Sequence, residues 1–182
     1  NMAVNEAFLD TATLRNSVVS HAKAIGYIPK SATAAEAIVK LQFDTTGQDP
    51  SYIVMEKGTQ FVSNISGVPT PFTNLETINI FEDEGGAFAG EVKLRQGVLR
   101  GLEWTYDATS ETQSFFIEDV TCDRSTITMT VNDKPWDNNQ VLSELGGETP
   151  TYFLQEGLDG VTEIYFGNGI FGKIPLDAQS IK

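Results

Sequence analysis

The chain has 182 residues, of which 40% are hydrophobic and 10% aromatic, a composition typical of a soluble globular protein that can bury a core. Its 25 acidic and 12 basic residues give a net charge of −13, which would repel a phosphate backbone and argues against nucleic acid as a partner. No stretch approaches the roughly 18 consecutive apolar residues that a membrane helix needs, and the single cysteine, Cys122, excludes an intrachain disulfide.

The first elements along the chain are helical. Between residues 4 and 25 the apolar side chains recur at near-helical spacing. Gly26 and Pro29 then follow, and these residue types are typical just after the C-terminus of a helix. We predict an N-terminal helical arm over residues 1–30, formed by one helix or by two helices with a break near Asp10. The apolar stripe of the arm either packs on the chain's own sheet or contacts a partner. The residues predicted for such a partner interface are Val4, Phe8, Leu14 and Val18.

After residue 37 the apolar period changes from about 3.6 to 2, which indicates half-buried strands. Short β-branched and aromatic runs then alternate with turns rich in Gly, Pro, Asn and Asp. These runs lie at residues 37–43, 52–55, 59–62, 75–81, 89–94, 102–106, 114–120, 125–131, 151–155 and 161–166. Residues 138–145 are the one further candidate helix. The predicted fold class is α+β, with the helical arm followed by a mainly antiparallel β body, a sandwich or barrel, over residues 31–182.

The run GNGIFG at 167–172 matches the G-x-G-x-x-G pattern of dinucleotide-binding loops and follows a predicted strand. That fingerprint requires a helix directly after the last glycine, whereas Pro175 follows almost at once and opposes one. A nucleotide site is therefore not expected. Instead, we predict that Asn168 and Gly169 form a type I′ turn, because both central residues of that turn need positive φ. Residues 165–166 and 171–174 would then pair as antiparallel strands.

No residue pattern predicts a catalytic or metal site. His21 is the only histidine and lies in the predicted arm, so it lacks the partners of a triad or a zinc site and is expected to pack on a helix or at the surface. The acidic run 82–84 lacks the pattern of a calcium loop and is expected to form a solvated hairpin turn. Cys122 has no predicted helix N-terminus near it to activate the thiol. We therefore expect no enzyme, no cofactor and no metal.

A carbohydrate-binding or hydrolytic β domain is the alternative function. It is suggested by aromatic side chains on which a sugar could stack and by carboxylates that could act as a glycosidase pair across a cleft. The aromatic residues are Trp104, Tyr106, Phe115, Phe116 and Trp136, and the carboxylates are Asp107, Glu118 and Asp119. This alternative requires Trp104 and Trp136 to be exposed in one acid-lined groove, whereas buried tryptophans would count against it.

Several short motifs follow one another along the chain. They are TATLRNSVV at 11–19, GYIP at 26–29, KGTQF at 57–61, FGNG at 166–169 and GKIP at 172–175. Together they resemble the motifs of the baseplate wedge proteins of contractile-tailed, T-even-like bacteriophages, within the baseplate-J superfamily. Their order and spacing carry the resemblance, since each motif is short. Residues 63–150 contain no further motif of this kind.

The resemblance implies a structural, non-enzymatic subunit of the virion, located in the tail baseplate and assembled in the host cytoplasm. It implies that the partners are a second copy of the chain and other baseplate wedge proteins, which together surround the central hub, with no membrane or nucleic acid involved. Members of the family are much longer than 182 residues, so the chain is expected to be a portion of a longer protein.

Overall fold

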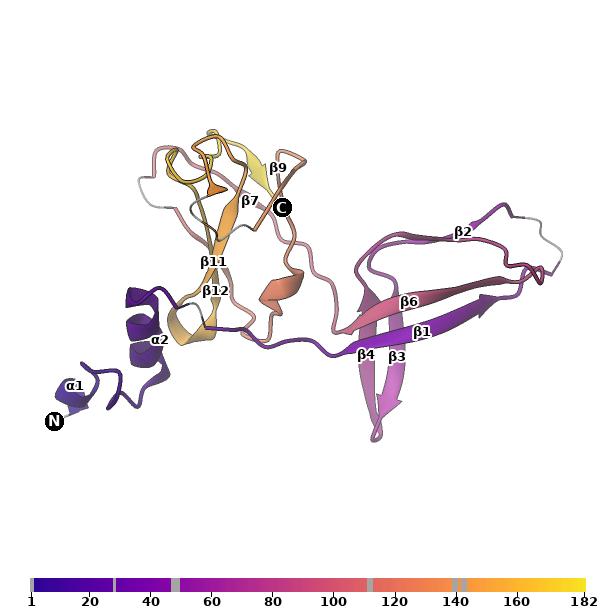
Figure 1. Ribbon diagram of the computed structural model, residues 1–182, viewed down its shortest axis with the longest axis horizontal. Coiled ribbons are helices and arrows are strands. Elements are labelled where there is room, and N and C mark those ends of the chain that lie inside the picture. The colour runs from indigo at the N-terminus through magenta and orange to yellow at the C-terminus, as the bar shows by residue number, and fades with distance from the viewer. Residues whose placement is uncertain (1, 28, 47–49, 111–112, 139–140, 142–143) are drawn as a thin grey trace. The chain divides into compact units, whose positions relative to one another are not determined.

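The computed structural model describes residues 2–27, 29–46, 50–110, 113–138, 141 and 144–182. The chain divides into two compact units (Figure 1). The terminal unit consists of Asn1–Thr33 and Leu102–Lys182, and the middle unit consists of Ala34–Gly101. The sequence analysis separated residues 1–30 from a single β domain at 31–182. The structure instead groups the N-terminal segment with the C-terminal strands, and it sets residues 34–101 apart.

The fold is mainly antiparallel β, and its helices are short. The two α-helices are α1 (Met2–Asn5) and α2 (Arg15–Ala24), so the predicted arm is two helices with a break rather than one rod. The α+β prediction is correct in its coarser form, a mainly antiparallel β protein, but helix contributes little of the structure. Within the described residues, no helix is both long enough and apolar enough to cross a membrane.

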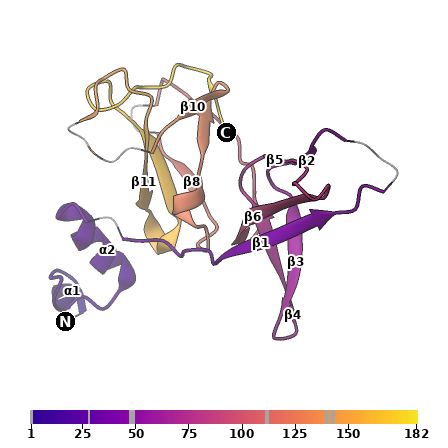
Figure 2. The same cartoon turned by 45° about the vertical axis from the view of Figure 1, so that its right-hand side comes forward.

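The middle unit contains one four-stranded sheet and one pair of strands (Figure 2). The sheet has the order β1 (Glu36–Phe43), β6 (Phe88–Gln96), β4 (Val68–Asn74), β3 (Gln60–Ile65), and the pair is β2 (Ile53–Met55) with β5 (Ile78–Ile80). The β1–β6 register runs from Glu36 opposite Arg95 to Phe43 opposite Phe88. Alternate residues of β1 are shielded, as the period of 2 predicted. The core is formed by Met55, Ile80, Phe88, Val92 and Leu94.

The hairpin of β3 and β4 was not fully predicted, because β4 contains Pro69 and Pro71, and proline argues against a strand inside a sheet. The register explains how both prolines are accommodated. Strand β6 pairs only with Phe72–Asn74 of β4. Pro69 therefore lies where β4 has β3 as its single neighbour, and Pro71 lies just past the end of β6, where its carbonyl oxygen accepts from the N–H of Gly97 (2.9 Å) and no N–H of its own is needed. The connecting residues Ser66 and Gly67 have φ of 52° and 85°, the positive values of a type I′ turn.

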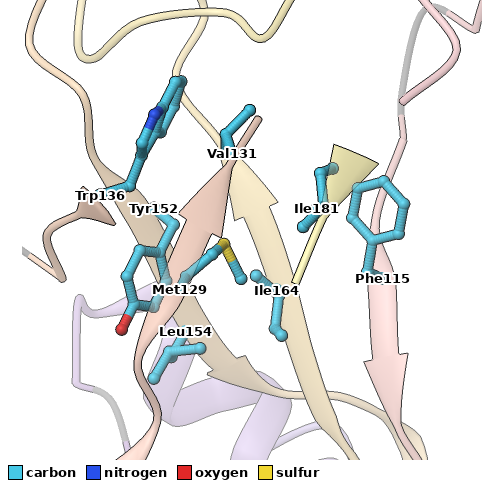
Figure 3. Packing of buried hydrophobic residues seen from close by; sticks show 8 residues of the cluster. All are labelled: Phe115, Met129, Val131, Trp136, Tyr152, Leu154, Ile164 and Ile181. Atoms are coloured by element: carbon cyan, nitrogen blue, oxygen red, sulfur yellow. The ribbon is translucent and has the colours of Figure 1, made fainter. Parts of the chain in front are cut away.

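The terminal unit contains two further sheets. One has the order β11 (Tyr152–Glu156), β12 (Thr162–Phe166), β8 (Phe115–Ile117), and the other has the order β10 (Lys134–Trp136), β9 (Met129–Val131), β13 (Ser180–Ile181), β7 (Trp104–Thr105). Two 3₁₀ turns, η1 (Arg124–Thr126) and η3 (Leu158–Gly160), lie between strands. Figure 3 shows the core between the two sheets, formed by Phe115, Met129, Val131, Trp136, Tyr152, Leu154, Ile164 and Ile181.

Most predicted strands are present. Strands β1, β3 and β6 are longer than predicted, most of the others are shorter, and a few elements differ. The predicted run 125–131 begins as the 3₁₀ turn η1 and becomes strand only in β9. Strands β10 and β13 were not predicted, since they have three and two residues and carry no usable alternation. The candidate helix at 138–145 falls largely on residues outside those that the structure describes.

The predicted hairpin at Asn168–Gly169 is wrong. Gly169 has a positive φ of 79°, but Asn168 does not have a positive φ, so the pair cannot form a type I′ turn. The reason is the Asn168 side chain, whose Oδ1 accepts hydrogen bonds from the backbone N–H groups of Ile170 (3.0 Å) and Phe171 (2.9 Å). This side-chain turn replaces the backbone hairpin, and residues 171–174 form no strand.

The glycines of this segment serve close packing of loops. The N–H of Gly172 donates to the carbonyl oxygen of Gly146 (3.2 Å), and the N–H of Lys173 donates to that of Thr149 (2.8 Å), which ties the segment to the preceding loop. A Cβ on Gly167 would collide with the backbone of Gly172, and one on Gly172 would lie 2.5 Å from Cγ2 of Thr151. The absent side chains therefore let one loop pack against another.

Candidate assembly surface

Glu6 holds the residues that lead into helix α2, which begins at Arg15. The N-cap residue of the helix is Leu14, whose side chain cannot accept a hydrogen bond. Oε1 of Glu6 accepts from the N–H (3.0 Å) and the hydroxyl (2.8 Å) of Thr13, and its Oε2 accepts from the N–H of Leu14 (3.2 Å). Hydrogen bonds from the Ser17 side chain and from Thr13 lower the pKa of Glu6 to about 2. The segment before α2 is thereby folded back onto the start of the helix.

His21 makes a second contact between the same two segments. Its Nε2 lies 2.9 Å from the backbone carbonyl oxygen of Glu6, and the ring is partly buried. His21, predicted to pack on a helix or to lie at the surface, is thus a partly buried residue of α2 that contacts the turn after α1. The hydroxyl of Thr11 donates to the carbonyl oxygen of Asn5 (2.7 Å) and closes the loop between α1 and α2. Residues 2–24 are therefore one folded segment rather than an extended arm.

A buried carboxylate at the end of β11 holds α2 in place. The side chain of Glu156 is only 1% exposed, and the Arg15 guanidinium binds it in bidentate fashion, with Nε–Oε1 and Nη2–Oε2 distances of 2.8 Å each. Nη2 of Arg124 donates to Oε2 at 3.2 Å. Burial of the carboxyl opposes its ionisation, but the two guanidinium groups outweigh this effect and lower the pKa of Glu156 below its usual value.

Arg124 also fixes the chain that leaves α2. Its Nη1 donates to the carbonyl oxygen of Pro29 (3.1 Å), and its backbone N–H donates to Oγ of Ser31 (3.1 Å). Next to Arg15, the side-chain amide of Asn16 donates to Oδ1 of Asp159 (2.9 Å), whose backbone N–H donates back to the Asn16 side chain (3.2 Å). Polar contacts on both sides of α2 therefore attach it to β11 and η3.

Burial of α2 itself involves few apolar residues. Only Val19 and Ala22 of the helix are buried. The four side chains predicted for a partner interface, Val4, Phe8, Leu14 and Val18, are all exposed, and Phe8 is 63% exposed. The same segment also exposes Met2, Leu9, Ile25 and Tyr27. The side chains of the apolar stripe are thus exposed within the terminal unit, and a group of exposed apolar side chains is typical of a contact surface.

The sequence analysis missed Arg15, Arg124 and Glu156. One signal for Glu156 exists in retrospect, because β11 places Tyr152, Leu154 and Glu156 on one face at a period of 2, and all three are buried. A carboxylate in line with core residues requires a buried cation. The sequence could not identify the two arginines, since they lie 141 and 32 residues away along the chain.

The acidic groups considered for chemistry form local turns. Oδ1 of Asp83 accepts from the N–H groups of Gly85 (2.9 Å) and Ala87 (3.0 Å), which makes the acidic run 82–84 the predicted hairpin turn. Asp107 and Asp119 each accept from the threonine two residues later. Within the described ranges, no cluster of three or more His, Cys, Asp or Glu residues could hold a metal ion.

The tryptophans proposed as a sugar platform belong to the core. Trp136 is buried, and Trp104 is partly buried and packs against the same cluster, with its ring centroid 5.6 Å from that of Phe115. The carbohydrate alternative is therefore not supported by these residues. Burial and the neighbouring carboxylate of Asp119 raise the pKa of the Cys122 thiol, so this cysteine is not activated as a nucleophile.

Comparison with known proteins agrees with the resemblance noted in the sequence. Residues 99–179, which lie almost entirely in the terminal unit, match the family described as "Bacteriophage baseplate wedge protein gp6, third domain". Baseplate wedge protein gp6 of Enterobacteria phage T4 is 32% identical over 174 residues, which cover 93% of this chain and 26% of that relative. The chain therefore spans about a quarter of the length of its relative, and it belongs to the family of bacteriophage baseplate wedge proteins.

Proposed function

We propose that the chain is a structural part of a phage tail baseplate wedge and that it acts through protein–protein contacts rather than catalysis. The observation that carries this proposal is the apolar stripe on residues 2–27, which is exposed on a segment that polar contacts hold in a fixed position. A surface that is already ordered loses little conformational entropy when a partner binds, so its apolar area contributes more fully to affinity.

The partners under this proposal are other baseplate wedge proteins and a second copy of the chain. The support is the relative's description as a baseplate wedge protein together with the stripe, whose four interface residues Val4, Phe8, Leu14 and Val18 are exposed in the terminal unit and offer a surface to the other wedge proteins. The protein is located in the virion tail baseplate, which is assembled in the host cytoplasm. It uses no cofactor, nucleic acid or membrane.

The test is a double substitution in the stripe, Phe8→Asp with Val18→Asp. Two buried charges in an apolar interface are strongly unfavourable, so we expect at least a tenfold loss of binding in pull-down against the other tail proteins of the same phage. The control is Ile170→Asp with Leu176→Asp, which adds equal charge at exposed apolar positions elsewhere in the terminal unit. If circular dichroism shows an intact fold and the stripe variant still assembles like its control, the stripe is not the contact surface.

A further inference from the structure

The β3–β4 hairpin of the middle unit differs from the rest of the chain in its charge. Residues 58–75 include no Asp, Glu, Lys or Arg, although 20% of all residues in the chain are charged. The hairpin nevertheless exposes apolar side chains on both of its faces: Val62 is 70% exposed on one face, and Ile65 and Val68 are a directly opposed, exposed pair on the other. An uncharged, apolar and exposed hairpin is unusual for a solvated surface.

Strand β3 also presents an open backbone edge. It is the last strand of its sheet, and the hairpin end projects beyond the part of β4 that pairs with β6 (Figures 1 and 2). The opposite edge strand, β1, carries the charged residues Glu36 and Lys40, which are a common protection against pairing with another sheet. Strand β3 has no such protection.

The register shows which groups of β3 face outward. Val62 lies opposite Pro71, which has no N–H and whose carbonyl oxygen accepts instead from the N–H of Gly97 (2.9 Å) on the far side of β4. Val62 and Pro71 therefore do not exchange ladder hydrogen bonds, and the N–H and C=O of Val62 point away from β4. By the period of 2, Gln60 and Asn64 point the same way.

We propose that β3 pairs antiparallel with β3 of a second copy, across a two-fold axis centred on Val62. This inference builds on the proposed function, which includes pairing of two copies, and it assigns that pairing to one surface. In this register Val62 opposes its own symmetry mate, and Gln60 opposes Asn64 at both ends. The opposed side chains are both apolar at Val62 and both amides at Gln60 and Asn64, and no like charges lie opposite each other. The strand is therefore complementary to itself, as a two-fold interface requires.

Charge favours a second copy as the occupant. Each chain carries a net charge of −13, so two copies repel wherever their carboxylates approach. The 18-residue stretch 58–75 contains no acidic side chain, so two such chains can meet there without opposing carboxylates. A basic partner would instead gain affinity from carboxylates, which this hairpin does not offer.

Cysteine cross-linking tests the register. In a Cys122→Ser background, which removes the natural thiol, Val62→Cys places two thiols on residues whose Cα atoms are about 5.5 Å apart in the proposed pair, a separation that a disulfide spans. We expect mild oxidation to give a covalent dimer at least fivefold faster than in the control Ile38→Cys. The control residue is 68% exposed on β1, the opposite edge strand.

Sedimentation provides the second measurement. Val62→Lys places two like charges opposite each other at the axis, and we expect it to raise the dimer dissociation constant at least tenfold, whereas Val62→Thr, which remains uncharged and β-branched, should raise it no more than threefold. A protein that stays monomeric, a Val62→Cys variant that cross-links no faster than Ile38→Cys, or a dimer indifferent to Val62→Lys would overturn the proposal. The baseplate function would survive each of these results if the protein still captured other tail proteins, and it would fail separately if the protein did not.

Discussion

The terminal unit and the middle unit use charge in opposite ways. In the terminal unit a buried carboxylate, Glu156, joins Arg15 and Arg124 and so fixes helix α2 on the strands of the same chain. In the middle unit the ion pairs of Glu36 with Lys93 and Arg95 lie on the less buried surface of β1 and β6, and the β3–β4 hairpin has no charge at all. In the terminal unit, the buried ion pairs fix where helix α2 packs on the strands. In the middle unit, the β3–β4 hairpin has no charged side chain that would oppose pairing of its edge strand with another chain.

The energetics of the two kinds of ion pair should differ accordingly. Pairs near the surface contribute about 0–1 kcal/mol, since water screens them and long side chains lose freedom. Removing one member of a buried pair costs about 3–5 kcal/mol, because the remaining charge stays desolvated and unpaired. The stability of the terminal unit should therefore depend on a single carboxylate in a way that the stability of the middle unit does not.

The largest expected effect comes from Glu156→Ala. It leaves the guanidinium of Arg124, whose side chain is 11% exposed, without its carboxylate, so we expect the unfolding free energy of the terminal unit to fall by about 3 kcal/mol. The matched change in the middle unit, Glu36→Ala, should cost about 1 kcal/mol or less. Urea denaturation with residue-level hydrogen exchange separates the two units, and equal losses in both variants would refute the comparison.

Two glycine substitutions should differ in cost between the two units, because the missing side chain faces open space at Gly67 and backbone atoms at Gly167. Gly67 has a positive φ of 85° and open space around its missing side chain, so Gly67→Ala should cost about 1 kcal/mol through backbone strain alone. A Cβ on Gly167 would collide with the backbone of Gly172, so Gly167→Ala must displace the loop and should lower the unfolding free energy by about 3 kcal/mol. Thermal unfolding measures both effects. A Gly167→Ala variant with a melting temperature equal to or above that of Gly67→Ala would show that the loop at 167–172 can shift at little cost.

Alternation of apolar residues predicted most strands of both units, because the period of 2 is a local property of the sequence. Strand β4 was not predicted because it contains two prolines. Both lie outside the residues that pair with β6, and that register depends on residues far away in the sequence. The type I′ geometry was assigned to Asn168–Gly169, whereas positive φ at both turn residues occurs at Ser66–Gly67 and Asn132–Asp133. The preference of Asn-Gly for this turn was overridden by the hydrogen bonds of the Asn168 side chain.

The candidate surface was predictable in part for the same reason. Helical spacing identified Val4, Phe8, Leu14 and Val18 as one apolar set, and their exposure is a finding of the structure. The polar contacts that hold this segment could not be deduced, since they join residues more than a hundred positions apart, as Arg15 and Glu156 do. Helical spacing groups these side chains by sequence, but it does not carry across the break between α1 and α2, and it does not reveal which partner they will contact.

The smallest expected effect concerns Glu6, an exposed residue of the terminal unit. Its pKa in the folded protein is about 2, against an ordinary value of 4.5, because the ionised carboxylate accepts hydrogen bonds from Ser17, Thr13 and Leu14. A lowered pKa means that the folded state binds the proton less readily than the unfolded chain. The stabilisation by Glu6 is therefore fully present above pH 4.5 and is lost as the pH falls through about 2.

The Glu6→Gln variant should therefore be less stable than the parent at pH 7 and indistinguishable from it near pH 2. The measurement is hydrogen exchange of the N–H groups of Thr13 and Leu14 across this range, since these two groups, just before α2, donate to Glu6. In the middle unit, Asp83 also accepts two backbone hydrogen bonds, which lower its pKa, so Asp83→Asn should show the same sign of pH dependence in the turn before β6 and none in α2. A Glu6→Gln difference that persisted at pH 2 would mean that the side chain stabilises α2 by packing and not by its charge.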